Sequence, residues 1–251
     1  KHRIVSLILP VIIKIIFSSN HKSLLLDNSL GILMELDYNT VYDSVFNNLI
    51  NICYTNDDSE VSLAALSLLR MICPLVMEKS FDSFQAYLEI IQNCLGSYSY
   101  NKVEAGLWIV EYISSMIYVN KSEDECCELW RETISYILDN IVSITKNCSA
   151  DKLKEMQALN ERVLFKYFAS FSVDMIQPLI DETKRVIVGD VIPKIAYVII
   201  SSLCQAFPNH APKQLIPFYV SKIEALDSKL PLYVSCLRGC INPRDDFEEF
   251  L

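Results

Sequence analysis

Glycine and histidine are scarce in this chain of 251 residues, which has 5 glycines and 3 histidines. The turns of barrels and sandwiches and the phosphate loops of dinucleotide-binding folds need glycine, so the composition argues against these architectures. The patterns GxGxxG, GxxxxGK[ST], HExxH and GxSxG, which hold nucleotides, zinc or a nucleophilic serine, are also absent. His2, His21 and His210 are too far apart in the sequence to form a zinc cluster with closely spaced ligands. We therefore predict no catalytic, cofactor-binding or metal-binding residues, and no cofactor.

Cysteine usage indicates a reducing compartment. The chain has 9 cysteines, an odd number, and none forms a CxxC pair. The adjacent Cys126 and Cys127 cannot easily bridge each other. Several others lie inside apolar runs and are expected to be buried free thiols: Cys53, Cys73 and Cys204. Cys236 and Cys240, four residues apart on one helix face, are interpreted as two core thiols rather than half of a metal site.

The charge balance argues against nucleic acid as a partner. Acidic residues number 31 and basic residues 22, giving a net charge of −9, whereas nucleic-acid binding needs clustered lysine and arginine. The densest basic patch, Lys184-Arg185, is too small for that role. The apolar stretch Ile4–Phe17 is too short to span a bilayer and contains Pro10 and Lys14, so no membrane association is predicted. The acidic pairs Asp57/Asp58, Asp245/Asp246 and Glu248/Glu249 are interpreted as solvated turn or tail residues.

Apolar helical stretches recur about every twenty residues and no strand pattern interrupts them. Paired helices at roughly 40–47 residues per unit are typical of HEAT and armadillo repeats. The sequence therefore predicts an all-α HEAT/armadillo-like α-solenoid of about six helix pairs. The expected pairs are Ile4–Phe17 with Ser23–Leu36, Val41–Cys53 with Glu60–Met77, Phe81–Leu95 with Lys102–Tyr118, Cys126–Thr145 with Lys152–Ala169, Val173–Val188 with Val191–Phe207, and Pro212–Leu226 with Leu230–Ile241. A compact all-α bundle is the alternative.

One helix of the second pair shows the pattern most clearly. In Glu60–Met77, the small Ala64 and Ala65 allow close helix approach, and a broad apolar face is expected from Val61, Leu66, Leu68, Leu69 and Ile72. Trp108 and Trp130 also lie within helical patterns and are expected in the core, whereas Tyr98 and Tyr100 fall in a loop. Because the first residues are already in helical register, we expect 1–251 to be a single run of repeats from a longer solenoid.

The last two pairs resemble a known family. The stretch VIPKIAYVIISSLCQAFPNHAPKQLIPFYVSKIEAL, followed by LPLYVSCLRGCI, is similar to the large single-chain HEAT-repeat activators of the proteasome core particle (the bleomycin-resistance type). In that family a short proline-containing link precedes a segment of the form leu-lys-x-phe/leu-ile/val-pro, which reads Pro212-Lys213-Gln214-Leu215-Ile216-Pro217 here. Leu230–Leu237 loosely matches the following family helix. The resemblance is specific only in about the last third of the chain.

The resemblance implies a non-enzymatic scaffold that caps the α-ring of the proteasome without ATP, in the cytoplasm and nucleus. The family anchor is a C-terminal hydrophobic residue, tyrosine and any residue, which Glu249-Phe250-Leu251 does not match. The resemblance therefore implies an internal segment without the anchor, and partner-binding residues stay unassigned. A karyopherin-like transport receptor or a phosphatase-scaffold-type solenoid, binding a small GTPase or a cargo, is the alternative function. An all-α enzyme with an unrecognised site is the third hypothesis.

Overall fold

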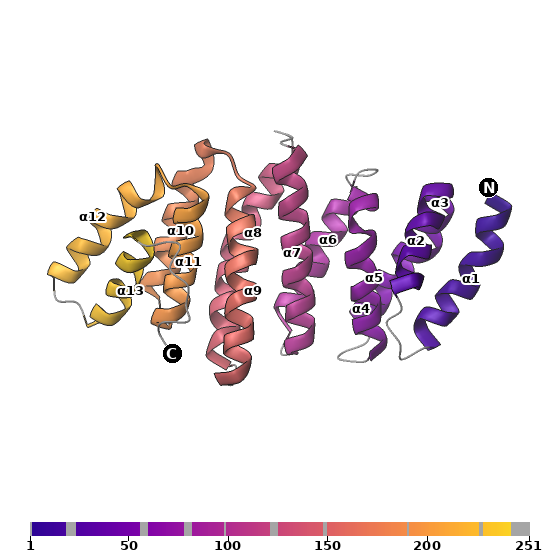
Figure 1. Cartoon of the computed structure of the whole chain (residues 1–251), viewed down its shortest axis with the longest axis horizontal. Coiled ribbons are helices and arrows are strands. Elements are labelled where there is room, and N and C mark those ends of the chain that lie inside the picture. Colours follow the sequence, from indigo (N-terminus) through magenta and orange to yellow (C-terminus); the bar gives the residue numbers. More distant parts are fainter. Residues whose placement is uncertain are drawn as a thin grey trace. The chain divides into compact units, whose positions relative to one another are not determined.

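The predicted all-α class is confirmed. The computed structural model describes residues 2–18, 24–55, 60–77, 82–97, 99–120, 125–147, 150–189, 191–225 and 228–241. Within these residues the regular elements are helices, and no strand occurs among them (Figure 1). This follows from apolar residues repeating at helical spacing with few glycines to interrupt them.

The described elements follow the predicted rhythm. In chain order they are α1 (His2–Ser18), α2 (Leu24–Leu36), α3 (Tyr38–Val41), the π-helical turn η1 (Tyr42–Phe46), α4 (Asn47–Thr55), α5 (Glu60–Met77), α6 (Asp82–Leu95), α7 (Tyr100–Asn120), α8 (Glu125–Asn147), α9 (Ala150–Ala169), the 3₁₀ turn η2 (Val173–Met175), α10 (Ile176–Val188), α11 (Pro193–Ala206), α12 (Ala211–Glu224) and α13 (Leu230–Ile241). Each predicted helix has a counterpart within a few residues of its expected ends.

Local chemistry explains two of the helix starts. The helix expected at Val41–Cys53 is built from α3, η1 and α4, and it begins earlier, at Tyr38. Asp37 caps it, because its carboxylate accepts hydrogen bonds from the Thr40 amide at 3.3 Å and the Thr40 hydroxyl at 2.8 Å. Pro193 lies in the first turn of α11, where a proline is tolerated because its missing amide hydrogen would have no partner within the helix.

The chain divides into two compact units, Lys1–Ile113 and Ser114–Leu251. In the first unit α1 contacts α2 and α3, α2 contacts α5, and α4 contacts both α5 and α6. A stack of rings helps to join these helices: the Tyr38 and Tyr42 centroids are 5.4 Å apart, and Tyr42 and Phe46 are 4.8 Å apart. Phe46 then meets Tyr87 of α6 at 5.5 Å, and the Tyr87 hydroxyl donates to the Leu69 carbonyl of α5 at 2.7 Å.

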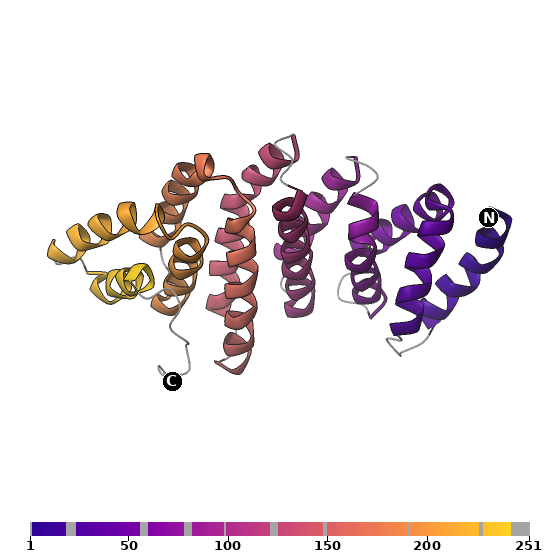
Figure 2. The ribbon, with the colours of Figure 1, turned by 45° about the horizontal axis from the view of Figure 1, so that its top comes forward.

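In the second unit, helices two places apart in the sequence are neighbours, as can be followed in Figures 1 and 2. α11 contacts α9 and α13, α10 contacts α8 and α12, and α12 also contacts α13. Gly239 permits the close approach of α13 to α11. A Cβ at this position would lie 3.2 Å from both the Tyr197 carbonyl oxygen and the Ser201 nitrogen.

The cysteines whose side chains are described are buried free thiols, which confirms the prediction for Cys53, Cys73, Cys204, Cys236 and Cys240 and adds Cys94. Burial raises the pKa of the thiols of four of them to about 12: Cys53, Cys73, Cys94 and Cys236. These thiols are protonated at neutral pH and therefore weakly reactive.

Two residues that the sequence predicted to be part of the core, Trp108 and Val61, are not buried. Trp130 is fully buried, as expected, but Trp108 is only half-buried, and the guanidinium of Arg70 lies 4.4 Å from its ring centroid. Ala65, Leu66, Leu68, Leu69 and Ile72 are buried, whereas Val61 is 40% exposed. Val61 lies in the first turn of α5, beyond the part of the helix that its neighbours cover.

No single helix in the described part of the chain is both long enough and apolar enough to cross a membrane. One sharply bent pair, Met156–Ala169 with Val173–Val188, reaches the length and composition only when its two helices are taken together, across a bend of 111°.

Candidate functional site: an apolar groove beside α1

Most residues that the sequence set apart do not gather into a site. His210 is exposed and precedes α12, and Cys236 and Cys240 are buried in α13. The structure does not describe His21, Tyr98 or the three acidic pairs, nor the surroundings of the His2, Cys126 and Cys127 side chains. Among the described residues, no group of three histidine, cysteine, aspartate or glutamate side chains is arranged to hold a metal ion.

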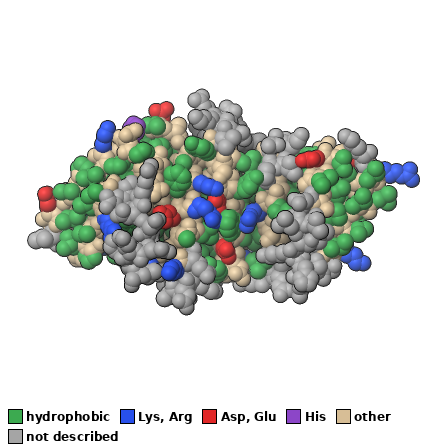
Figure 3. Space-filling model, in the orientation of Figure 1, with side chains coloured by type: hydrophobic (Ala, Val, Ile, Leu, Met, Phe, Trp, Pro, Cys, Tyr) green, Lys and Arg blue, Asp and Glu red, His purple; other side chains and the backbone are tan. Residues whose placement is uncertain are grey.

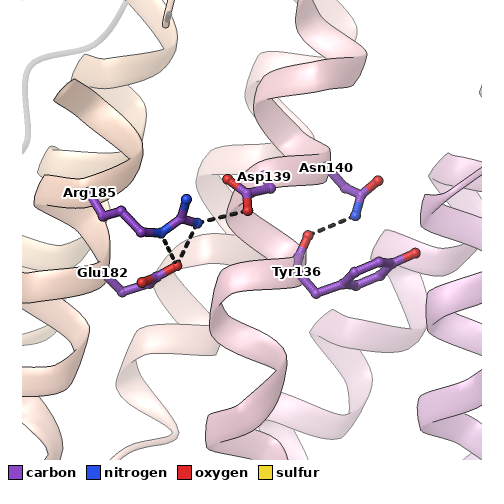
Figure 4. A network of polar contacts seen from close by, with 5 residues as sticks. All are labelled: Tyr136, Asp139, Asn140, Glu182 and Arg185. Atoms are coloured by element: carbon purple, nitrogen blue, oxygen red, sulfur yellow. Dashed lines mark hydrogen bonds and ion pairs between the residues drawn. The ribbon is translucent and has the colours of Figure 1, made fainter. Parts of the chain in front are cut away.

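The basic pair Lys184-Arg185 is engaged in contacts within the second unit. Arg185 of α10 donates to Asp139 of α8 through Nη2 at 2.7 Å, and to Glu182 through Nε at 2.7 Å (Figure 4). The hydrogen bond from Arg185 lowers the pKa of the Glu182 carboxyl, which favours its charged form. Lys184 lies 4.8 Å from the Phe218 ring centroid of α12. The pair therefore ties neighbouring helices together rather than presenting an unbound basic patch.

The candidate site is a groove in the first unit, between α1 and the segment formed by α3 and η1. Its volume is about 390 Å³. One wall is made by α1, through Leu9, Pro10 and Ile13, and the opposite wall by Thr40 and Ser44. Most of the lining is therefore aliphatic, with hydroxyl groups on the far side.

Two irregular helical segments face this groove. Pro10 lies inside α1, where it cannot donate the usual hydrogen bond to the carbonyl four residues earlier. Ser44 lies in η1, a π-helical turn, and such turns are frequently found at functional sites because an extra residue re-aims neighbouring side chains. The two departures from regular α-helix thus shape both walls.

α1 also carries an exposed apolar stripe, formed by residues that do not line the groove. The stripe is formed by large side chains three or four residues apart, with exposed fractions from 41% to 69%: Ile4, Leu7, Ile8, Val11 and Ile15. Figure 3 shows hydrophobic side chains gathered over this end of the first unit, with lysine and arginine side chains at its margins. Side chains at this spacing lie on one helix face, and a contiguous exposed apolar face of this kind marks an interaction surface.

The charge on α1 is of one sign. Its sequence, HRIVSLILPVIIKIIFS, contains Arg3 and Lys14 and no acidic residue. Both basic side chains are exposed, and Lys14 also lines the groove. Among the residues whose exposure the structure describes, the exposed acidic residues nearest in the sequence are Glu35 and Asp43, which belong to other elements. The α1 wall thus presents aliphatic surface and positive charge, while the exposed Asp43 precedes Ser44 on the opposite wall.

The groove lining is mainly aliphatic with a few polar groups. The groove lining offers aliphatic carbons, the hydroxyl groups of Ser6, Thr40 and Ser44, and one ammonium. No imidazole, thiol or carboxylate stands among the lining residues to act as a base for those hydroxyls.

Sequence reasoning missed this site, although it named Pro10 and Lys14. It read Ile4–Phe17 as an apolar helix and could not tell which face its neighbours would leave uncovered. The sequence signal for this site was an apolar helix with two basic residues, Arg3 and Lys14, and no acidic residue. The sequence of η1, YDSVF, gives no cue for a π-helical turn.

Comparisons with known proteins add no relative: no family model matches the chain, and no curated protein or solved structure matches it significantly.

Proposed function

We propose that this chain is a segment of a non-enzymatic helical-repeat scaffold, with HEAT-like pairs, that binds protein partners. The observation that carries the proposal is the contact between alternate helices. α9, α11 and α13 form one series of neighbours and α8, α10 and α12 another, while α1 with α3 and α4 with α6 repeat this relation in the first unit. Stacked helix pairs make such contacts with their neighbours in each of two layers.

The repeat arrangement can be tested by small-angle X-ray scattering on the whole chain. A compact globule of this length has a radius of gyration of about 18 Å. Six stacked pairs at 8–10 Å per layer would be longer in one direction, so we expect a clearly larger value together with an elongated distance distribution. A radius of about 18 Å with a symmetrical distribution would favour the compact bundle instead.

For the partner, we propose the α-ring of the proteasome core particle, and hence a role in the cytoplasm and nucleus. Its support is the similarity of Pro212–Pro217 and the flanking helices to the single-chain activators. We expect purified core particles to be retained on the immobilised chain, in the absence of ATP, and not on an immobilised helical protein of similar charge. A chain that retains no core particles, while still folded by circular dichroism, would exclude this partner.

A further inference from the structure

We propose that Cys204 of α11 and Cys240 of α13 form a reversible disulfide in the presence of a peroxide, which joins the two helices covalently. Both residues belong to the second unit, so the inference uses contacts within that unit alone. It does not depend on the proposed function or on the identity of a partner.

The backbones of α11 and α13 approach each other closely where the two thiols lie. A Cβ on Gly239 would lie 3.2 Å from both the Tyr197 carbonyl oxygen and the Ser201 nitrogen, so the two backbones come nearly into contact. Cys240 follows Gly239 directly, and Cys204 lies about one turn beyond Ser201. A disulfide needs Cα atoms within about 7 Å of each other, a condition that so close a crossing favours.

The two thiols are neighbours in the core of the second unit. The Cys240 thiol forms a hydrogen bond with the Cys204 thiol, and the two residues are 4% and 0% exposed. Both are free thiols in the structure. Because their sulfur atoms already face each other, a covalent bond between them requires only a small shift of the side chains.

Cys236, the third thiol on these helices, is a poor partner for Cys240. It lies four residues earlier on the same helix, so the two Cβ atoms are about 5–6 Å apart. A disulfide spans a Cβ separation of about 3.5–4.5 Å. The Cys236 thiol faces Tyr219 of α12 instead. The packing therefore favours one pairing, between Cys204 and Cys240.

The reaction transfers two electrons from the thiols to the peroxide. The sulfur of Cys240, the less deeply buried of the two, attacks one peroxide oxygen and breaks the O–O bond. This step forms a sulfenic acid, and the leaving hydroxide takes the thiol proton to become water. The sulfur of Cys204 then attacks the Cys240 sulfur, the S–O bond breaks, and the departing hydroxide leaves with the Cys204 proton as a second water.

The bond should form slowly. The hydrogen bond with Cys204 and burial raise the pKa of Cys240, so little of the reactive thiolate is present at neutral pH. We therefore expect formation over about minutes to hours, as a response to sustained oxidation. Disulfides in reducing compartments are usually transient and redox-sensing, which fits the environment that the free thiols indicate.

The test treats the folded, reduced full-length chain with hydrogen peroxide for up to a day, alkylates the remaining thiols, and maps the links by mass spectrometry after trypsin digestion. Trypsin cuts after lysine and arginine, so Cys204, Cys236 and Cys240 fall on separate peptides, which are 195–213, 230–238 and 239–244. We expect 195–213 joined to 239–244 as the main linked product, about 2 Da lighter than the two reduced peptides together. Dithiothreitol should separate them again.

Two variants serve as a matched pair, each checked for folding by circular dichroism. Cys240→Ser should remove the link, whereas Cys236→Ser, which alters another buried thiol of the same helix, should keep it. The linked chain should unfold with an equilibrium constant about a hundredfold lower than the reduced chain, because the bond closes a loop of about 36 residues in the unfolded state.

Mapping the unmodified chain decides the proposal even where a variant fails to fold. The proposal would be overturned by a folded chain that yields no link between 195–213 and 239–244. It would equally be overturned if the link were no more abundant than in a chain oxidised in urea, where all nine cysteines pair without regard to native contacts. A linked chain with a lower urea midpoint than the reduced chain would show that the fold does not accommodate the bond.

Discussion

Replacing Gly106 by alanine should destabilise the first unit, although alanine is the better helix former. The added Cβ would lie 2.8 Å from the Cys94 Cβ and 3.3 Å from the Leu95 Cδ2, closer than the 3.5–4.0 Å at which carbon atoms normally rest. Cys94, Leu95, Val103 and Leu107 are each at most 1% exposed. The crossing of α6 and α7 is therefore closely packed and has little space in which to relax.

The two opposing effects can be compared. Replacing glycine by alanine within a helix gains about 1 kcal/mol, whereas forcing a methyl group into a packed core costs about 1–3 kcal/mol. Because the obstructing Cys94 atom is itself a Cβ, fixed to the backbone, we expect a cost near the upper end. The expected net loss is about 1–2 kcal/mol of the free energy of unfolding.

Urea unfolding followed by circular dichroism at 222 nm measures this loss. Asn101→Ala, at an exposed position of the same helix, raises helix propensity without a clash and should leave the midpoint unchanged or slightly higher. In the double variant G106A/C94G the obstructing Cβ is gone, so its loss should be smaller than the sum of the two single losses. A G106A midpoint at or above that of the unmodified chain would refute the packing argument.

Three further predictions concern the core. Ala65→Asp should unfold its part of the chain, since Ala65 is 0% exposed and an unpaired buried charge costs several kcal/mol. Asp246→Ala should leave the melting temperature nearly unchanged. Equal thermal melting of the two variants would contradict the assigned helix face. Asn160→Leu should raise the free energy of unfolding by about 1–3 kcal/mol, because Asn160 is fully buried and neither its amide oxygen nor its amide nitrogen has a partner among the described residues. Urea unfolding measures this change, and a lower midpoint than that of the unmodified chain would show that the amide is bonded. Stability should fall as the pH rises above about 9, because burial raises the folded pKa of the four thiols to about 12 while unfolded thiols ionise near their ordinary value. The free energy of unfolding should fall by about 3 kcal/mol for the four thiols together between pH 7.5 and 9.5. Urea midpoints that stay level over this interval would contradict this prediction. So would midpoints that fall by the same amount in the double variant Cys53→Ala/Cys73→Ala.

The helices were predictable because their cause is local. Apolar residues at a spacing of three and four, with polar turns between them, produced counterparts of the predicted helices, from α1 to α13. The same pattern correctly placed Trp130 and the thiols of Cys53, Cys73 and Cys204 in the core. It failed at Val61 and Trp108, where an apolar residue of a helix lies beyond the surface that neighbouring helices cover.

The groove was not predictable, because it depends on what lies next to α1. Pro10 was visible in the sequence, but the opposite wall comes from Thr40 and Ser44, some thirty residues later. The turn η1, which positions Ser44, has no recognisable sequence pattern.

By itself, the sequence determined that this protein is helical, where its helices lie to within a few residues, and which residues are apolar enough to be buried. Only the tertiary structure decided which of those residues are buried. In α11, every residue from Ile195 to Cys204 is buried, because helices pack around it. In α1, an equally apolar sequence leaves Leu7 69% exposed. Hydrophobicity belongs to the residue, but burial requires a neighbouring element, and that difference leaves one apolar face of α1 exposed.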